Sequence, residues 1–128
     1  MSWDVDADSE SEHDRRHALL RACMSNAAAA DQREVAVAIR PLLESFLRVA
    51  YPENFPASTL LGRFKNLCEQ RVGTAQEVLS RADTDELSDL LEYANRFHHD
   101  TNPAWETEVV NDGELRGFVN RTLALAKR

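Results

Sequence analysis

The sequence lacks the features that mark many enzyme families. It has four glycines in 128 residues, and it contains neither a glycine-rich phosphate loop nor a G-x-S-x-G turn. The two cysteines, Cys23 and Cys68, do not have C-x-x-C spacing, so we expect two reduced, buried side chains and no bound cofactor. No apolar run approaches the roughly 18 residues of a membrane span, and the N-terminus is acidic where a signal peptide is basic. We therefore expect a cytoplasmic protein with no membrane partner.

The N-terminus has no basic residue, whereas acidic and basic residues are nearly balanced in the rest of the chain. The formal net charge is -7, and residues 1–12 contain five acidic residues and no basic one. Residues 13–128 hold the other 17 acidic residues against all 15 basic ones. We predict that residues 1–12 form a disordered acidic tail and that residues 13–128 form a single helical domain. The charge of this domain is close to neutral, which is compatible with a local basic patch that binds RNA.

Apolar residues recur with the helical period throughout the domain, and no stretch alternates with the period of a strand. This pattern predicts an all-α fold, a helical bundle of about four longer helices with shorter helices between them. The predicted helices cover residues 12–25, 32–50, 59–71 and 74–81, and two more begin near 84 and 112. Ser58 or Thr59 is the expected cap of the third helix, and Thr74 and Glu77 have capping-box spacing for the fourth. Pro41 predicts a kink or a break in the second helix.

The stretch from Glu92 to Trp105, EYANRFHHDTNPAW, is the densest cluster of reactive side-chain types in the chain. If the helix that begins near 84 continues through it, His98 lies on the apolar face, whereas Asn95, Arg96 and His99 share the polar flank. His98 is therefore a predicted core residue, and His99 is the histidine available for chemistry. The non-catalytic alternative is that His99 interacts with the helix dipole at an ordinary helix end.

A second line of polar residues lies on the predicted helix 32–50. Arg40, Glu44 and Arg48 are spaced i, i+4 and i+8, opposite the apolar arc of that helix. Such a line is typical of a salt-bridged, solvent-exposed face. It becomes a candidate catalytic site only if another helix brings a histidine to it.

His13 and His17 have H-x-x-x-H spacing, which places two imidazoles on one face of a helix. The zinc-protease motif requires glutamate after the first histidine, but Asp14 stands here, and the two arginines that follow it repel a cation. The pattern therefore argues against a zinc protease. A metal-binding helical protein that uses His13, His17, His98 and His99 is a third hypothesis, and we assign no metal site.

The chain from about Ala36 to its C-terminus resembles a known group of proteins. The segments AIRPLLESFLRVAYPE and LLEYANRFHHDTNP are similar to the C-terminal part of bacterial AAA-type ATPases of the SMC-like, defence-associated kind. They also resemble the helical HEPN superfamily of ribonuclease toxins, whose members end such ATPases or stand alone. The resemblance implies a HEPN-like, usually dimeric domain. The chain has no Walker loop, so an ATPase would be a separate partner.

The resemblance also implies a set of functional residues. The HEPN signature is an arginine followed four to six residues later by histidine, whereas Arg96 precedes His99 by three. The anticodon-nuclease branch has Arg-x-x-x-Glu on one helix and a later histidine, and Arg40, Glu44 and His99 match that pattern. Metal-independent RNA cleavage is therefore implied, and the implied catalytic residues are Arg40, Glu44, Arg96 and His99. The residues expected to bind the RNA are Asn95, Asp100, Asn102 and Arg48.

Two leading hypotheses follow, and they differ in class. The first is a toxin-like ribonuclease of phage defence that acts on tRNA or another RNA, as a homodimer beside an ATPase. The second is a non-catalytic dimerisation or interaction module, in which Asn95 and Asp100 satisfy backbone groups at a helix end and Trp105 covers it. An enzyme should bring Arg40 and Glu44 to the segment that carries His99, whereas a structural module should leave Arg40 far from it.

Overall fold

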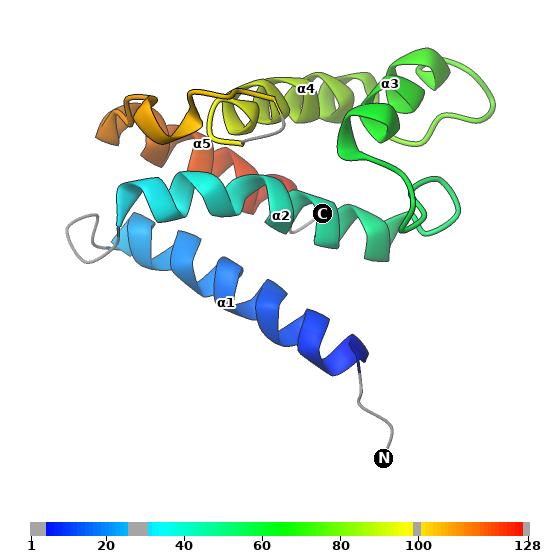
Figure 1. Ribbon diagram of the computed structural model, residues 1–128. Helices are drawn as coiled ribbons and strands as arrows, with labels where there is room; N and C mark the ends of the chain where they lie inside the picture. The colour runs from blue at the N-terminus through cyan, green and yellow to red at the C-terminus, as the bar shows by residue number, and fades with distance from the viewer. Residues whose placement is uncertain (1–4, 26–30, 99–100, 127–128) are drawn as a thin grey trace.

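In the residues that it describes, the structure, a computed structural model, is a bundle of five α-helices (Figure 1). It describes residues 5–25, 31–98 and 101–126. The elements are α1 (Val5–Ser25), α2 (Gln32–Ala50), α3 (Leu61–Arg71), α4 (Arg81–Asn95), the 3-10 helix η2 (Trp105–Thr107) and α5 (Asp112–Leu125). These described residues contain no strand, so the predicted all-α class is confirmed. No helix among them is long and apolar enough to cross a bilayer.

Helix α1 packs against α2 and α5 and begins earlier than the hydrophobic period predicts. Residues 5–12, which composition assigns to a tail, form its first turns. Leu20 and Cys23 are 0% and 1% exposed and make the buried stripe of α1. The helical period of the sequence also predicts Ala18 and Ala22 in this stripe, and it is wrong there, because both are exposed. Alanine buries little apolar area, so the larger Leu20 decides which face of the helix turns inward.

Helix α2 lies at the centre of the bundle, where it contacts α1, α4 and α5 (Figure 1). Asp31 caps it, because its Oδ1 accepts the N–H groups of Arg33 at 2.9 Å and Glu34 at 3.2 Å. The helix does not break at Pro41 but continues to Ala50. Packing against three neighbouring helices therefore outweighs the single hydrogen bond that a proline removes.

Helix α3 begins one or two residues later than its predicted cap residues suggest. Its N-cap is Leu60, which makes no side-chain capping bond. Ser58 and Thr59, the predicted caps, lie in the preceding turn. The carbonyl of Thr59 instead accepts a hydrogen bond from Arg48 of α2 at 2.9 Å. The contact with Arg48 thus holds this segment in a turn, where local sequence signals predict the start of a helix.

The short helix predicted over residues 74–81 does not form. This segment is instead a turn that leads into α4. The two residues of the predicted capping box bond to other groups instead. Thr74 donates to the carbonyl of Arg71 at 2.7 Å, and Glu77 accepts the N–H of Gly73 at 2.9 Å. Gly73 has a φ of 79°, which favours glycine. The same side chains therefore close the end of α3 and do not start a new helix.

Helices α4 and α5 are joined by an aromatic stack. The rings of Tyr93 and Phe118 are nearly parallel, with centroids 4.1 Å apart. Ser80 caps α4 and Asn111 caps α5, each by accepting an N–H of the first turn. Helix α4 also contacts α2 and α3, so it packs against three other helices.

Both cysteines are buried and free, as predicted. Burial raises the pKa of the Cys68 thiol to about 11 from its ordinary value of 9.0. The unfolded chain releases this proton near pH 9 and the folded chain near pH 11, so the folded state holds the proton over a wider range. The stability that comes from the neutral thiol is therefore complete below pH 9 and is lost as the pH rises towards 11.

We expect this loss to be measurable by urea unfolding at pH 8 and pH 10.5. The free energy of unfolding should fall by about 2 kcal/mol more in the wild-type protein than in a Cys68→Ala variant. Every other group that titrates in this range is present in both proteins, so its contribution cancels in the comparison. An equal fall in both proteins would contradict a buried, neutral Cys68 thiol.

Candidate active site

The polar line of α2 forms a ladder of ion pairs. Arg40 Nε lies 3.2 Å from Glu44 Oε1, and Arg48 Nη1 lies 3.4 Å from Glu44 Oε2. The sequence predicts that this line is an outer face, but Arg40 is only 8% exposed. The prediction is wrong for Arg40 because α4 packs against α2 and covers it. No pattern within α2 itself reveals that contact.

Helix α4 adds Asn95 to the ladder. Its Oδ1 accepts a hydrogen bond from Arg40 Nη1 at 2.8 Å. Arg40 therefore pairs with a carboxylate on its own helix and with an amide on another, which offsets the cost of burying its charge. Its remaining nitrogen, Nη2, has no hydrogen-bond partner within the described part of the chain. Four predicted functional residues thus come together: Arg40, Glu44, Arg48 and Asn95.

Arg48 holds the far end of the ladder against the linker between α2 and α3. Its Nη2 donates to the carbonyl of Thr59 at 2.9 Å, and its guanidinium lies 4.5 Å from the centroid of the Phe55 ring. Phe55 is fully buried, so Arg48 covers part of the core. These contacts fix the orientation of Arg48 beside Glu44.

Helix α4 ends at Asn95, before the histidine pair. The helical wheel therefore does not extend to His98, which is half-buried in the following turn. His99 and Asp100, the predicted catalytic and binding residues, lie outside the described residues. In the sequence, His99 follows four positions after the residue that contacts Arg40.

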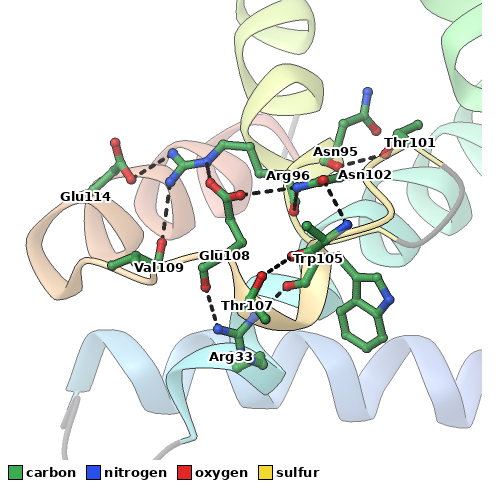
Figure 2. A network of polar contacts seen from close by, with 11 residues as sticks. Arg33, Asn95, Arg96, Thr101, Asn102, Trp105, Thr107, Glu108, Val109 and Glu114 are labelled. Atoms are coloured by element: carbon green, nitrogen blue, oxygen red, sulfur yellow. Dashed lines mark hydrogen bonds and ion pairs between the residues drawn. The ribbon is translucent and has the colours of Figure 1, made fainter.

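Arg96 has its own set of partners, in the loop after α4 and at the start of α5 (Figure 2). Its Nε lies 3.0 Å from Glu108, its Nη1 lies 2.9 Å from Glu114, and its Nη2 donates to the carbonyl of Val109 at 3.4 Å. Partial burial acts to lower the pKa of Arg96, but the hydrogen bonds that it donates to Glu114 and Glu108 outweigh this effect, so the pKa is raised. Arg96 therefore anchors the loop between α4 and α5.

Asn102 and Thr101 close the end of α4 (Figure 2). Asn102 Nδ2 donates to the carbonyl of Arg96 at 2.9 Å and to Glu108 at 3.2 Å. Thr101 Oγ1 donates to the carbonyl of Asn95 at 2.7 Å. These bonds satisfy carbonyls that a helix end leaves without partners. Asn102, predicted to bind RNA, thus has a local structural role.

The sequence did not identify Arg33 as important, although Arg33 ties the same loop to α2 (Figure 2). Its Nη1 donates to the carbonyl of Trp105 at 2.8 Å, and its Nη2 donates to the carbonyl of Glu108. An arginine in the first turn of a helix resembles an ordinary exposed charge. Since its partners are backbone carbonyls distant in the sequence, no local signal marks it.

The histidine pair of α1 faces α2. His13 Nδ1 lies 2.6 Å from Ser45 Oγ, and the ring centroids of His13 and His17 are 6.0 Å apart. Within the described ranges, no three His, Cys, Asp or Glu side chains gather where they could hold a metal ion. His13, His17 and His98 therefore do not converge, and the structure gives no support to a shared histidine site.

Comparisons of the chain with family models, with curated proteins and with solved structures give no match. The HEPN-like resemblance therefore stays a prediction. The function has to be inferred from the α2 ladder, from Asn95 and from the loop that Arg96 anchors.

Proposed function

We propose that this chain is a HEPN-like helical domain that binds RNA and cleaves it without a metal ion. The proposal is carried by the contact between Arg40 and Asn95 at 2.8 Å, beside the Arg40–Glu44 pair. This contact joins the Arg-x-x-x-Glu pair of α2 to the end of the helix after which His99 follows in the sequence. A structural module with Arg40 on a solvated face would lack this arrangement.

Each side chain has a defined role in the proposed reaction. The Glu44 carboxylate takes the proton of a ribose 2′-hydroxyl, whose oxygen attacks the adjacent phosphorus and forms a cyclic phosphate. The 5′-oxygen leaves and receives a proton from the imidazolium of His99. Arg40 and Arg48 donate hydrogen bonds to the non-bridging phosphate oxygens. The Glu44 and Arg48 side chains are 25% and 31% exposed, so RNA can reach them from solvent.

Arg96 is a positioning residue in this proposal. Two carboxylates, Glu108 and Glu114, already compensate its charge, so it is poorly placed to bind a phosphate. By anchoring the loop, it supports the segment that follows Asn95. This assignment differs from the resemblance, which implies a catalytic role for Arg96.

The proposal extends to partners that rest on the resemblance alone. They are a second copy of the chain, a separate ATPase and a cytoplasmic RNA such as tRNA, in a defence system with a toxin-like nuclease. The near-neutral charge of residues 13–128 permits RNA binding through local arginines.

The test is incubation of the purified protein with total tRNA in EDTA, beside Glu44→Gln and His99→Ala variants. Each substitution removes one proton-transfer group, so we expect the cleavage rate to fall by about 10²- to 10⁴-fold. Asp89→Asn is the matched control, because it makes the same carboxylate-to-amide change at the ion pair with Arg121, 3.0 Å away. The control should cleave at the wild-type rate.

Intact RNA with the wild-type protein would contradict the nuclease proposal for this domain. Equal cleavage by the wild type and both variants would remove Glu44 and His99 from the mechanism. Cleavage that appears only when a divalent cation is added would indicate a metal-dependent reaction instead.

A second candidate function, a non-catalytic interaction module, is favoured by the closed end of α4. Arg96, Asn102 and Thr101 satisfy their partners within the loop, as a purely structural turn would. If the wild-type protein leaves RNA intact, sedimentation of the chain alone and with candidate partners becomes the relevant measurement.

A further inference from the structure

A groove between α3 and α4 lies next to the α2 ladder. Its volume is about 360 Å³. The polar and small residues along its walls are Gly62, Lys65 and Asn66 of α3 and Ser88, Glu92 and Asn95 of α4. Helices α3 and α4 pack directly against each other, so the two walls belong to one rigid pair of helices.

Asn95 belongs both to this groove and to the ladder. Its side chain lines the groove, and its Oδ1 accepts the hydrogen bond from Arg40. The groove therefore opens beside the group proposed to hold the scissile phosphate. If a ligand places a phosphate near Arg40, the part of the ligand next to that phosphate lies close to the groove.

The walls of the groove carry both donors and acceptors of hydrogen bonds. Asn66 and Asn95 contribute amides, Ser88 a hydroxyl and Glu92 a carboxylate. Leu91 is 4% exposed and adds an apolar surface between them. Amides and hydroxyls of this kind recognise base edges and ribose hydroxyls in RNA.

The α3 wall of the groove carries one cationic side chain, Lys65, and the α4 wall carries one carboxylate, Glu92. Lys65 Nζ lies 2.9 Å from Glu69, and the Lys65 side chain is 24% exposed. An ammonium has three donors, so Lys65 can contact a phosphate while it keeps this partner.

We propose that the groove binds one nucleotide of a single-stranded RNA, next to the phosphate held by Arg40. This inference rests on the proposed function, because it names the substrate contact of the same site. The volume lies in the range of roughly 300–1,000 Å³ that small-molecule pockets occupy. The RNA is single-stranded because an unpaired base can present its whole edge to the side chains of the groove.

Gly62 provides a way to block the groove without disturbing the fold. A Cβ added at Gly62 meets no atom within 4 Å, so the side chain of a Gly62→Leu variant occupies open space in the groove. Gly117 of α5 also has nothing within 4 Å and does not line the groove. Gly117→Leu is therefore the matched control, since both substitutions raise helix propensity in the same way.

The experiment measures fluorescence anisotropy with labelled 2′-O-methyl oligonucleotides of adenylate, cytidylate and uridylate, which lack the 2′-hydroxyl that attacks phosphorus. We expect Gly62→Leu to raise the Kd by roughly tenfold or more and Gly117→Leu to leave it unchanged. Asn66→Asp, which adds a negative charge to the exposed wall, should weaken binding as well. An unchanged Kd in both groove variants, or no binding by the wild-type protein, would overturn the inference.

The same variants separate this inference from the proposed function. If the wild-type protein cleaves RNA and Gly62→Leu cleaves it equally well, the groove is not a subsite although the nuclease proposal stands. If the oligonucleotides bind and Gly62→Leu prevents it while no RNA is cleaved, the groove is a nucleotide site and the nuclease proposal fails.

Discussion

Replacing Arg40 with methionine is expected to lower the free energy of unfolding by about 3 kcal/mol and to slow the proposed RNA cleavage by at least about 10²-fold. The first effect arises because Arg40 is 8% exposed and its loss leaves Asn95 Oδ1 without its donor and Glu44 with Arg48 as its remaining partner. The second arises because the phosphate loses a preorganised cation. Urea unfolding and the tRNA assay in EDTA measure the two effects separately.

A double variant distinguishes the structural role of Arg40 from its chemical role. Arg40→Met combined with Glu44→Leu replaces the partly buried pair by apolar groups of similar size, which usually restores most of the lost stability. We expect the double variant to unfold close to the wild-type midpoint and to remain inactive. Cleavage by a stable double variant would exclude both residues from the chemistry. A loss below about 0.5 kcal/mol in the single variant would contradict the burial of Arg40.

Replacing Phe64 with alanine is expected to cost about 4 kcal/mol of stability, because a fully buried aromatic ring leaves a large cavity. Phe64 is 0% exposed and stacks on Phe55, with ring centroids 4.9 Å apart. Its ring also lies 6.0 Å from that of Tyr51, so it joins α3 to the linker after α2. Urea unfolding provides the measurement, and oligonucleotide binding should weaken together with stability because α3 forms one wall of the groove.

Leu60→Ala is the control for Phe64→Ala, since Leu60 lies beside the start of α3 and is 71% exposed. It should change the free energy of unfolding by less than about 0.5 kcal/mol. If the two variants lose similar stability, Phe64 does not occupy the core that the structure describes.

The sequence predicted the helical class and most of the helix positions because these follow from local periodicity. Helix α2 ends as expected at Ala50, and Asn111 caps α5 at the predicted start. Local signals failed where a distant contact competed with them. Thr59 binds Arg48 and does not start α3, and the capping-box residues after α3 close that helix.

The candidate site was predictable only in part. The spacing of Arg40 and Glu44 identified an ion pair on one helix, and both residues are in the site. Spacing cannot show that Arg40 is buried, that Asn95 binds it or that Arg33 holds the loop, because each contact joins segments far apart in the sequence. Arginine is a residue type that catalytic sites use, but Arg96 forms ion pairs with Glu108 and Glu114 and does not join the α2 ladder.

The sequence by itself determined the all-α class, the positions of α2 and of the start of α5, and the pairing of Arg40 with Glu44, since helical period and i,i+4 spacing act over a few residues. Only the tertiary structure decided which polar residues of EYANRFHHDTNPAW face the α2 ladder and which anchor the loop. Asn95 and Arg96 are adjacent in the chain, yet one binds Arg40 and the other binds Glu108 and Glu114. Consecutive side chains at a helix end point in different directions, and the packing of α4 between its neighbours determines what each of them meets.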